Sequence, residues 1–320
     1  MLEVQGLTRY YGRFRALDDV SFRIDTHQVV GLLGLNGAGK STTLRVLAGL
    51  LMPSAGTVRI EGTDATFAPN ELRRRIGFLP EHPPLYDEMR VTEFLAWCGR
   101  MKGMTRAEVA RRLPEVIEVC ALGSVRDDVI GVLSHGYRKR VGIAQAIVHR
   151  PALVLLDEPV SGLDPHQIVG MRQTVRSLGR EATVIVSSHI LSEVEQTCDR
   201  ILVLDEGRLV ADGTEEELAS RFGAGRRVQV EVRGDEAAVR RALAGVEAVR
   251  GVETAPAGDG LVQADVSMEK DAREAVVAAL VGAGLGVRRV EEGTHELERI
   301  FLRLTAEEAA EPSQAKEAHP

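Results

Sequence analysis

One segment of the sequence combines glycines, a lysine and a hydroxyl at the spacing of a phosphate-binding loop. Residues 34–41 read GLNGAGKS, which fits the pattern GxxxxGK[ST] between an apolar run typical of a buried strand and a segment with helical periodicity. Glycines let backbone N–H groups close around phosphate oxygens, and the following helix points its positive end at them. We therefore predict that Lys40 reaches the β- and γ-phosphates of a nucleotide and that the Ser41 hydroxyl holds Mg²⁺. The residues expected to bind the nucleotide here are Gly34, Leu35, Asn36, Gly37, Ala38, Gly39, Lys40, Ser41 and Thr42.

Two adjacent carboxylates follow a second apolar run. The segment LVLLDE ends in Asp157 and Glu158. Beside a phosphate loop, the first acid can bind Mg²⁺ through water, and the second can polarise the water that attacks the γ-phosphate. Many strands end in acids, so this pattern by itself also fits a structural role. Together with the phosphate loop, it predicts a Mg²⁺-dependent nucleotide hydrolase with Glu158 as a catalytic residue.

Three further segments, read with the first two, resemble the ATP-binding cassette family. They are LSHGY at 133–137, SGLD at 161–164, and His189 at the end of the apolar run TVIVSS. In the family's terms, GLNGAGKST is the Walker A loop, LSHGY the signature, LLDEP the Walker B strand and SGLD the D-loop. His189 matches the switch histidine. The order and spacing match over residues 1 to about 220.

This resemblance implies ATP and Mg²⁺ as cofactors and two chains that pack head to tail around two ATP molecules. Each ATP would lie on the Walker A loop of one chain and under the signature of the other, so Ser134 and Gly136 would contact a γ-phosphate at a helix N-terminus. His189 would touch the γ-phosphate and help to hold the attacking water. Tyr11 matches the aromatic residue that stacks on adenine, although a single aromatic near a strand end also fits a structural role. The predicted signature and D-loop residues are Ser134, His135, Gly136, Tyr137 and Asp164.

The sequence departs from the family pattern at two places. Glu81, in IGFLPEHPPLY, stands where the family usually has Gln. A carboxylate there can still ligate Mg²⁺, but it adds negative charge near the γ-phosphate; the alternative is a solvated loop acid. The signature reads SHGY rather than SGGQ, with His135 where related exporters often carry Lys. The segments LPEHPPLY, SHGYRKR and ERIFLRLT resemble the subgroup that serves gliding-motility-type and related drug or polysaccharide exporters.

The elements that must position these residues are strands alternating with helices. The pattern predicts an α/β phosphate-loop NTPase (RecA-like) fold over residues 1–222, with a mostly parallel sheet and a helical insert at about 84–150. Residues 226–304 show a βαββαβ order, which predicts a small ferredoxin-like accessory domain. That domain could sense a ligand or help the dimer, but its apolar alternation is also explained by its own core. Residues 305–320 are polar and predict a disordered tail.

Composition limits the function classes. The chain has 320 residues, 44% of them hydrophobic, and a net charge of −7, which argues against a general nucleic-acid binder. Its three cysteines, Cys98, Cys120 and Cys198, lack metal-ligand spacing and fit thiols of a reducing compartment. The N-terminus does not resemble a signal peptide, and no stretch approaches the about 18 apolar residues of a membrane helix. If the chain powers transport, another chain must form the pathway.

We therefore predict an ATPase that drives transport, in the export direction, through a separate membrane permease. It would act as a homodimer or with a paired ATP-binding subunit, in the cytoplasm on the inner face of the cell membrane. The alternative is a soluble ABC ATPase that regulates or remodels a macromolecule. A single cassette and the lack of sustained heptads favour transport. The transported substrate contacts the permease, so this sequence does not specify it.

Overall fold

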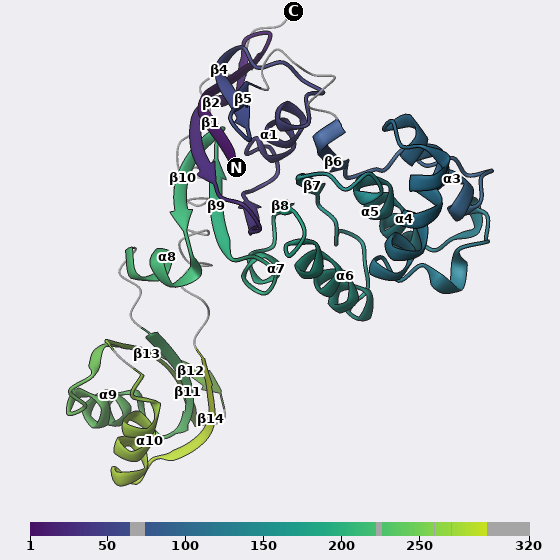
Figure 1. The fold of residues 1–320 in the computed structure, drawn as a ribbon. Helices are drawn as coiled ribbons and strands as arrows, with labels where there is room; N and C mark the ends of the chain where they lie inside the picture. The colour runs from purple at the N-terminus through teal and green to yellow at the C-terminus, as the bar shows by residue number, and fades with distance from the viewer. Residues whose placement is uncertain (65–73, 222–225, 259, 270, 293–320) are drawn as a thin grey trace, which may run out of the picture. The chain divides into compact units, whose positions relative to one another are not determined.

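The computed structural model describes residues 1–64, 74–221, 226–258, 260–269 and 271–292. The chain forms two compact units, Met1–Glu215 and Glu216–Pro320 (Figure 1). The segment ERIFLRLT and the predicted tail at 305–320 lie outside the described residues. No helix in the described part of the chain has the length and apolar character that a membrane crossing needs.

A six-stranded sheet forms the centre of the first unit, with the strand order β10-β9-β3-β8-β7-β6. All neighbouring strands pair in parallel except β10, which is antiparallel to β9 at one edge. The central strands β3, β7 and β8 are buried along their whole length, which explains their continuous apolar runs. The mostly parallel sheet that the sequence predicts is therefore confirmed. The strands are β3 (Val29–Leu33), β6 (Ile76–Leu79), β7 (Leu153–Asp157), β8 (Thr183–Ser188), β9 (Arg200–Asp205) and β10 (Arg208–Gly213).

A second, antiparallel sheet lies in the same unit and was not distinguished in the sequence. Its strand order is β2-β1-β4-β5. One hydrophobic core contains side chains of both sheets, such as Leu7 and Leu155, together with Leu44 and Leu47 of helix α1 (Lys40–Leu47). The helix that follows the phosphate loop is thus held between two sheets. The strands are β1 (Leu2–Tyr11), β2 (Phe14–Ile24), β4 (Ala55–Ile60) and β5 (Thr63–Asp64).

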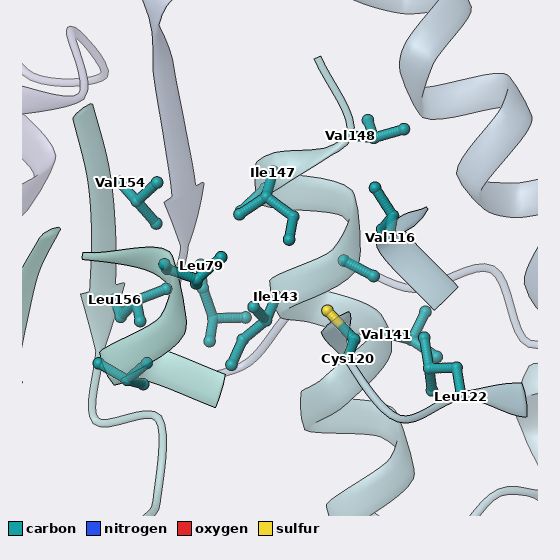
Figure 2. Close-up of a cluster of buried hydrophobic side chains, with 14 of the residues drawn as sticks. Leu79, Val116, Cys120, Leu122, Val141, Ile143, Ile147, Val148, Val154 and Leu156 are labelled. Carbon is teal, nitrogen blue, oxygen red and sulfur yellow. The ribbon is translucent and has the colours of Figure 1, made fainter. Parts of the chain in front are cut away.

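A helical block lies between β6 and β7 in the sequence, as the periodicity predicts. It contains α3 (Val91–Met101), α4 (Arg106–Val119) and α5 (His135–Ile147), with short 3-10 turns between α4 and α5. Ile143 and Ile147 of α5 belong to one buried cluster with Leu79, Val154 and Leu156 of the large sheet (Figure 2). This packing fixes α5, which begins inside the signature segment, against the sheet that carries the carboxylates.

One close approach of α5 to the sheet is at a glycine. A Cβ atom added to Gly77 in β6 would lie 2.1 Å from the carbonyl oxygen of Ala146. Only glycine fits this contact without moving the helix. Helices α6 (Pro165–Leu178) and α7 (Leu191–Glu195) also belong to the first unit, and α8 (Glu215–Arg221) begins at the division between the two units.

The second unit has the βαββαβ element order that the sequence predicts. Helices α9 and α10 lie on one face of a four-stranded antiparallel sheet with the strand order β12-β13-β11-β14 (Figure 1). It has a hydrophobic core of its own, which includes Val230 and Leu243. The elements are β11 (Arg226–Arg233), α9 (Glu236–Ala244), β12 (Val249–Gly258), β13 (Leu261–Met268), α10 (Arg273–Gly282) and β14 (Gly286–Glu292).

Candidate functional site

The phosphate-loop segment joins the end of β3 to the start of α1. Gly37 and Gly39 have φ values of 93° and 103°, a left-handed conformation that glycine adopts without strain. The Lys40 side chain folds back over the loop, and its Nζ donates to the carbonyl oxygens of Gly34 at 2.8 Å and Leu35 at 3.0 Å. The loop therefore has the open turn and the inward-facing cation that a phosphate site needs.

Two hydroxyl groups meet the first carboxylate at the ends of β7 and β8. Ser41 Oγ donates to Asp157 Oδ1 at 3.1 Å, and Ser187 Oγ donates to the same oxygen at 2.7 Å. The Glu158 backbone N–H donates to Ser187 Oγ at 2.9 Å, so Ser187 links the two acids. Asp157 is only 1% exposed. These contacts fix its carboxylate next to Ser41.

This donor set fits Mg²⁺. A hydroxyl and a carboxylate within 3.1 Å of each other are hard oxygen ligands, and Mg²⁺ usually takes one or two protein oxygens plus phosphates and water. In the described ranges, no three His, Cys, Asp or Glu side chains gather in a form that could hold a metal alone.

The second carboxylate lies between two basic side chains. Glu158 has a φ of 47°, and its Oε2 lies 3.0 Å from His189 Nδ1. Its Oε1 lies 3.6 Å from Lys40 Nζ. Burial lowers the pKa of Lys40, while the charges of Glu158 and Asp157 oppose that shift. The Glu158 side chain is thus held in one orientation at the carboxyl end of β7.

A cavity of about 420 Å³ collects most of the predicted nucleotide-binding residues. It is lined by the phosphate loop, Glu81, Glu158 and His189, and by Tyr11 at the end of β1. Tyr11 is 43% exposed, and the guanidinium carbon of Arg9 lies 5.0 Å from the centre of its ring. The arginine covers one face of this ring. The structure thus brings these five separate parts of the first unit together around one cavity.

The signature residues do not line this cavity in the same chain. Ser134 is the N-cap of α5, and its Oγ accepts from the Tyr137 backbone N–H. Nε2 of His135 lies 3.3 Å from the Ser161 carbonyl oxygen in the D-loop segment, and the residue is exposed. A Cβ on Gly136 would lie 2.0 Å from the side chain of Gln167. The N-terminus of α5 therefore presents its polar groups outside the cavity.

The D-loop residue Asp164 has a structural contact in this chain. It is the N-cap of α6, and its Oδ1 accepts from the Gln167 backbone N–H at 2.9 Å. This contact fixes the start of α6 beside the signature segment.

Sequence reasoning missed two residues of this region, Ser187 and Lys139. The Lys139 side chain is 2% exposed, and its Nζ donates to the carbonyl oxygens of Glu81 at 2.6 Å and Glu158 at 3.1 Å. Lys139 follows Gly136 by three residues and precedes Ile143 by four, so helical spacing puts it on the buried face of α5. A lysine on that face is the signal that could have found it.

Comparisons with known proteins agree with the motifs and the geometry. Residues 17–161 match the family model described as ABC transporter. The chain is 36% identical over 315 residues to the daunorubicin/doxorubicin resistance ATP-binding protein of Streptomyces peucetius, covering 98% of this chain and 94% of that protein. It is 32% identical to the linearmycin resistance ATP-binding protein of Bacillus subtilis, covering 95% and 98%.

Solved structures show the same likeness. The structure of an ATP-binding subunit of an ABC transporter is 35% identical, with a TM-score of 0.64, and the match covers 70% of this chain and 94% of that one. A dimeric ATP-binding cassette bound to ADP and phosphate in a post-hydrolysis state is 26% identical, with a TM-score of 0.61, covering 67% and 98%. Both the expected phosphate-loop fold and the family resemblance are therefore confirmed.

Proposed function

The chain belongs to the family of ABC transporter ATP-binding proteins and is an ATPase of that family, and we propose that it drives export through a separate membrane permease. The observation that carries this proposal is that Lys40, Ser41, Glu158 and His189 line one cavity, with Asp157 bonded to Ser41 beneath them. Relatives that match nearly the whole chain are named as drug-resistance ATP-binding proteins, and others as Nod factor export proteins, which supports the export direction.

Different side chains of the site bind the phosphates, Mg²⁺ and adenine. The loop N–H groups and Lys40 bind the β- and γ-phosphates, while Ser41 and Asp157, with Glu81 at the rim, hold Mg²⁺. Mg²⁺, when bound, neutralises charge on the phosphate oxygens. The half-exposed Tyr11 ring lines the cavity and is the surface proposed to stack on adenine.

Glu158 and His189 act on the attacking water. Because Glu158 is held by His189 on one side and faces Lys40 on the other, its carboxylate can accept the proton of a water in the cavity. That water forms a bond to the γ-phosphorus as the bond to the bridging oxygen of ADP breaks. The products are ADP and phosphate.

We propose that two copies, or this chain and a paired subunit, complete each site. Ser134 and Gly136 lie at the N-terminus of α5, outside the cavity of their own chain, where they can approach the γ-phosphate bound to a second chain. His135 and Tyr137 flank this contact, and Asp164 lies beside it at the start of α6. The dimeric cassette among the structural neighbours supports this arrangement.

The permease contact is proposed for the loop after β6 and for α3. Tyr86 and Trp97 are 45% and 41% exposed, their rings meet edge to face at 5.1 Å, and Met101 is also exposed. Exposed aromatic residues and methionine are enriched at protein interfaces. The permease would hold the chain on the cytoplasmic face of the membrane.

The test combines one variant with one partner experiment. Glu158→Gln keeps the shape of the side chain but cannot accept the proton, so ATP still binds, turnover is lost and ATP shifts the protein to a dimer in size-exclusion chromatography. Glu118→Gln, an exposed change in α4, is the matched control and keeps turnover. Full hydrolysis by Glu158→Gln would place the base elsewhere.

The partner experiment separates transport from the alternative. The protein is purified from membranes with its bound chains, and its ATPase rate is compared with that of the isolated chain. A co-purified protein with several membrane spans that raises the rate supports export through a permease. Full activity of the isolated chain, with no membrane protein bound, would favour a soluble regulatory ATPase.

A further inference from the structure

Lys139 of α5 is a buried lysine whose ammonium group donates hydrogen bonds to backbone carbonyls. Lys139 is among the largest fully buried side chains of the protein, and its two hydrogen-bond acceptors are backbone carbonyl oxygens. A neutral amide could donate to these carbonyls at a lower desolvation cost than an ammonium group. The two hydrogen bonds therefore do not by themselves explain why a charged side chain occupies this buried position.

Nearby carboxylates stabilise the positive charge of Lys139. Burial lowers the pKa of Lys139, and the charges of Glu81, Asp157 and Glu158 oppose this shift. Of these three acids, Glu81 is the one that departs from the family pattern, which has a neutral Gln at this position. The chain thus carries one extra negative charge at the rim of the cavity. It also carries the buried ammonium group of Lys139, which donates a hydrogen bond to the Glu81 carbonyl oxygen.

The position of Lys139 also links three parts of the site. Its helix begins at the N-cap Ser134, and its Nζ bonds to the loop that carries Glu81 and to the strand end that carries Glu158. Gly142, one turn further along α5, would place a Cβ 2.5 Å from the Leu79 side chain, so this side of the helix lies directly on β6. A change at Lys139 can therefore move the catalytic carboxylate, the Glu81 loop and the signature end of α5 together.

We propose that Lys139 is a positioning residue that works as a unit with Glu81. Its charge offsets the Glu81 carboxylate, and its two hydrogen bonds hold the Glu81 loop and the Glu158 backbone at a fixed distance from α5. This inference rests on the proposed ATPase site. It predicts that the requirement for a cation at 139 exists because residue 81 is an acid.

A double-mutant cycle tests this unit. The four proteins are wild type, Glu81→Gln, Lys139→Gln and the double variant, and their kcat and KM for ATP–Mg²⁺ are measured along with their melting temperatures. In the wild-type background, Lys139→Gln is expected to lower kcat by about tenfold or more, with a smaller change in KM. In the Glu81→Gln background, the same substitution is expected to change kcat by less than about threefold. Any hydrogen bond that Lys139→Gln loses is lost in both backgrounds, so the coupling between positions 139 and 81 reports the charge.

Arg138→Gln is the matched control. It removes a positive charge from the adjacent position of α5, where the guanidinium pairs with Asp87 at 2.7 Å instead. Its effect on kcat is expected to be the same with Glu or Gln at 81. Unequal effects of Arg138→Gln would mean that any charge on α5 couples to residue 81, and this would overturn the specific role of Lys139.

The remaining outcomes also decide the proposal. Equal losses from Lys139→Gln in both backgrounds, or no loss in either, would overturn it. If Lys139→Gln folds poorly, recovery of its melting temperature by Glu81→Gln supports the pairing, and failure to fold in both backgrounds refutes it. A wild-type protein without ATPase activity would instead refute the proposed function. The melting temperatures, which need no turnover, would still test the pairing of residues 81 and 139.

Discussion

The histidine that follows α5 makes the stability of the first unit depend on pH. Nε2 of His149 lies 3.1 Å from the Ile76 carbonyl oxygen in β6. A carbonyl only accepts hydrogen bonds, so Nε2 carries the proton of the neutral ring. Nδ1 is buried and has no hydrogen-bond partner among the described residues. Burial and the charge of Lys102 lower the pKa of His149 to about 4.

The sign and size of the effect follow from this pKa. An unfolded histidine titrates at about 6.5, so below that pH the unfolded chain binds more protons than the folded one. The stability that neutral His149 contributes is fully present above about pH 6.5 and is lost as the pH falls through about 4. A shift of roughly 2.5 units corresponds to at most about 3 kcal/mol.

The charged side chains around His149 also disfavour protonation of its ring. It lines a cavity of about 570 Å³ beside α4, in which basic side chains outnumber acidic ones. A positive charge on the ring would therefore be opposed from several sides. The charged groups that line this cavity are Arg74, Lys102, Glu108, Arg111, Arg112, Glu115 and Arg150.

The assay compares wild type with His149→Gln, whose amide can donate to the same carbonyl but does not titrate. Urea unfolding is followed at several pH values by the fluorescence of Trp97, the one tryptophan of the chain, which lies in α3. Between about pH 7 and about pH 4, wild type should lose up to about 3 kcal/mol more stability than the variant. Carboxylates titrate in both proteins and cancel in the difference. The exposed His166→Gln serves as the control, and parallel curves for wild type and His149→Gln would refute the reasoning.

Three further predictions concern separate parts of the chain. Lys40→Ala removes the cation of the phosphate loop, so nucleotide titration should show loss of tight ATP–Mg²⁺ binding; unchanged affinity would contradict the site. Gly77→Ala places a Cβ 2.1 Å from the Ala146 carbonyl oxygen and should lower the free energy of unfolding in urea by about 1–3 kcal/mol. The control Gly123→Ala, whose Cβ meets nothing within 4 Å, should lower it by less. Val230→Ala should destabilise the second unit by about 2 kcal/mol in circular dichroism while the Trp97 transition stays in place; a shift of both would show that the units unfold together.

The sequence by itself determined the features that depend on neighbouring residues. The phosphate loop is a contiguous segment, so the glycines that permit its turn and the helix that follows it are specified locally. The same holds for Asp157 and Glu158, because an apolar run that ends in acids places them at the end of a buried strand. The βαββαβ order of the second unit was also readable, since each element has its own periodicity.

Only the tertiary structure decided which distant residues meet. The pairing of Lys139 with the backbones of Glu81 and Glu158 joins segments 58 and 19 residues apart, and no local periodicity encodes such a contact. The division of the strands into two sheets likewise depends on pairing partners, because an alternating strand has the same pattern beside any neighbour. Packing of α5 against β6 carries the signature end of the helix outside the cavity of its own chain and brings the buried Lys139 to the backbone carbonyl of Glu158. Such close packing depends on shapes that several segments present together, and a linear pattern does not contain them.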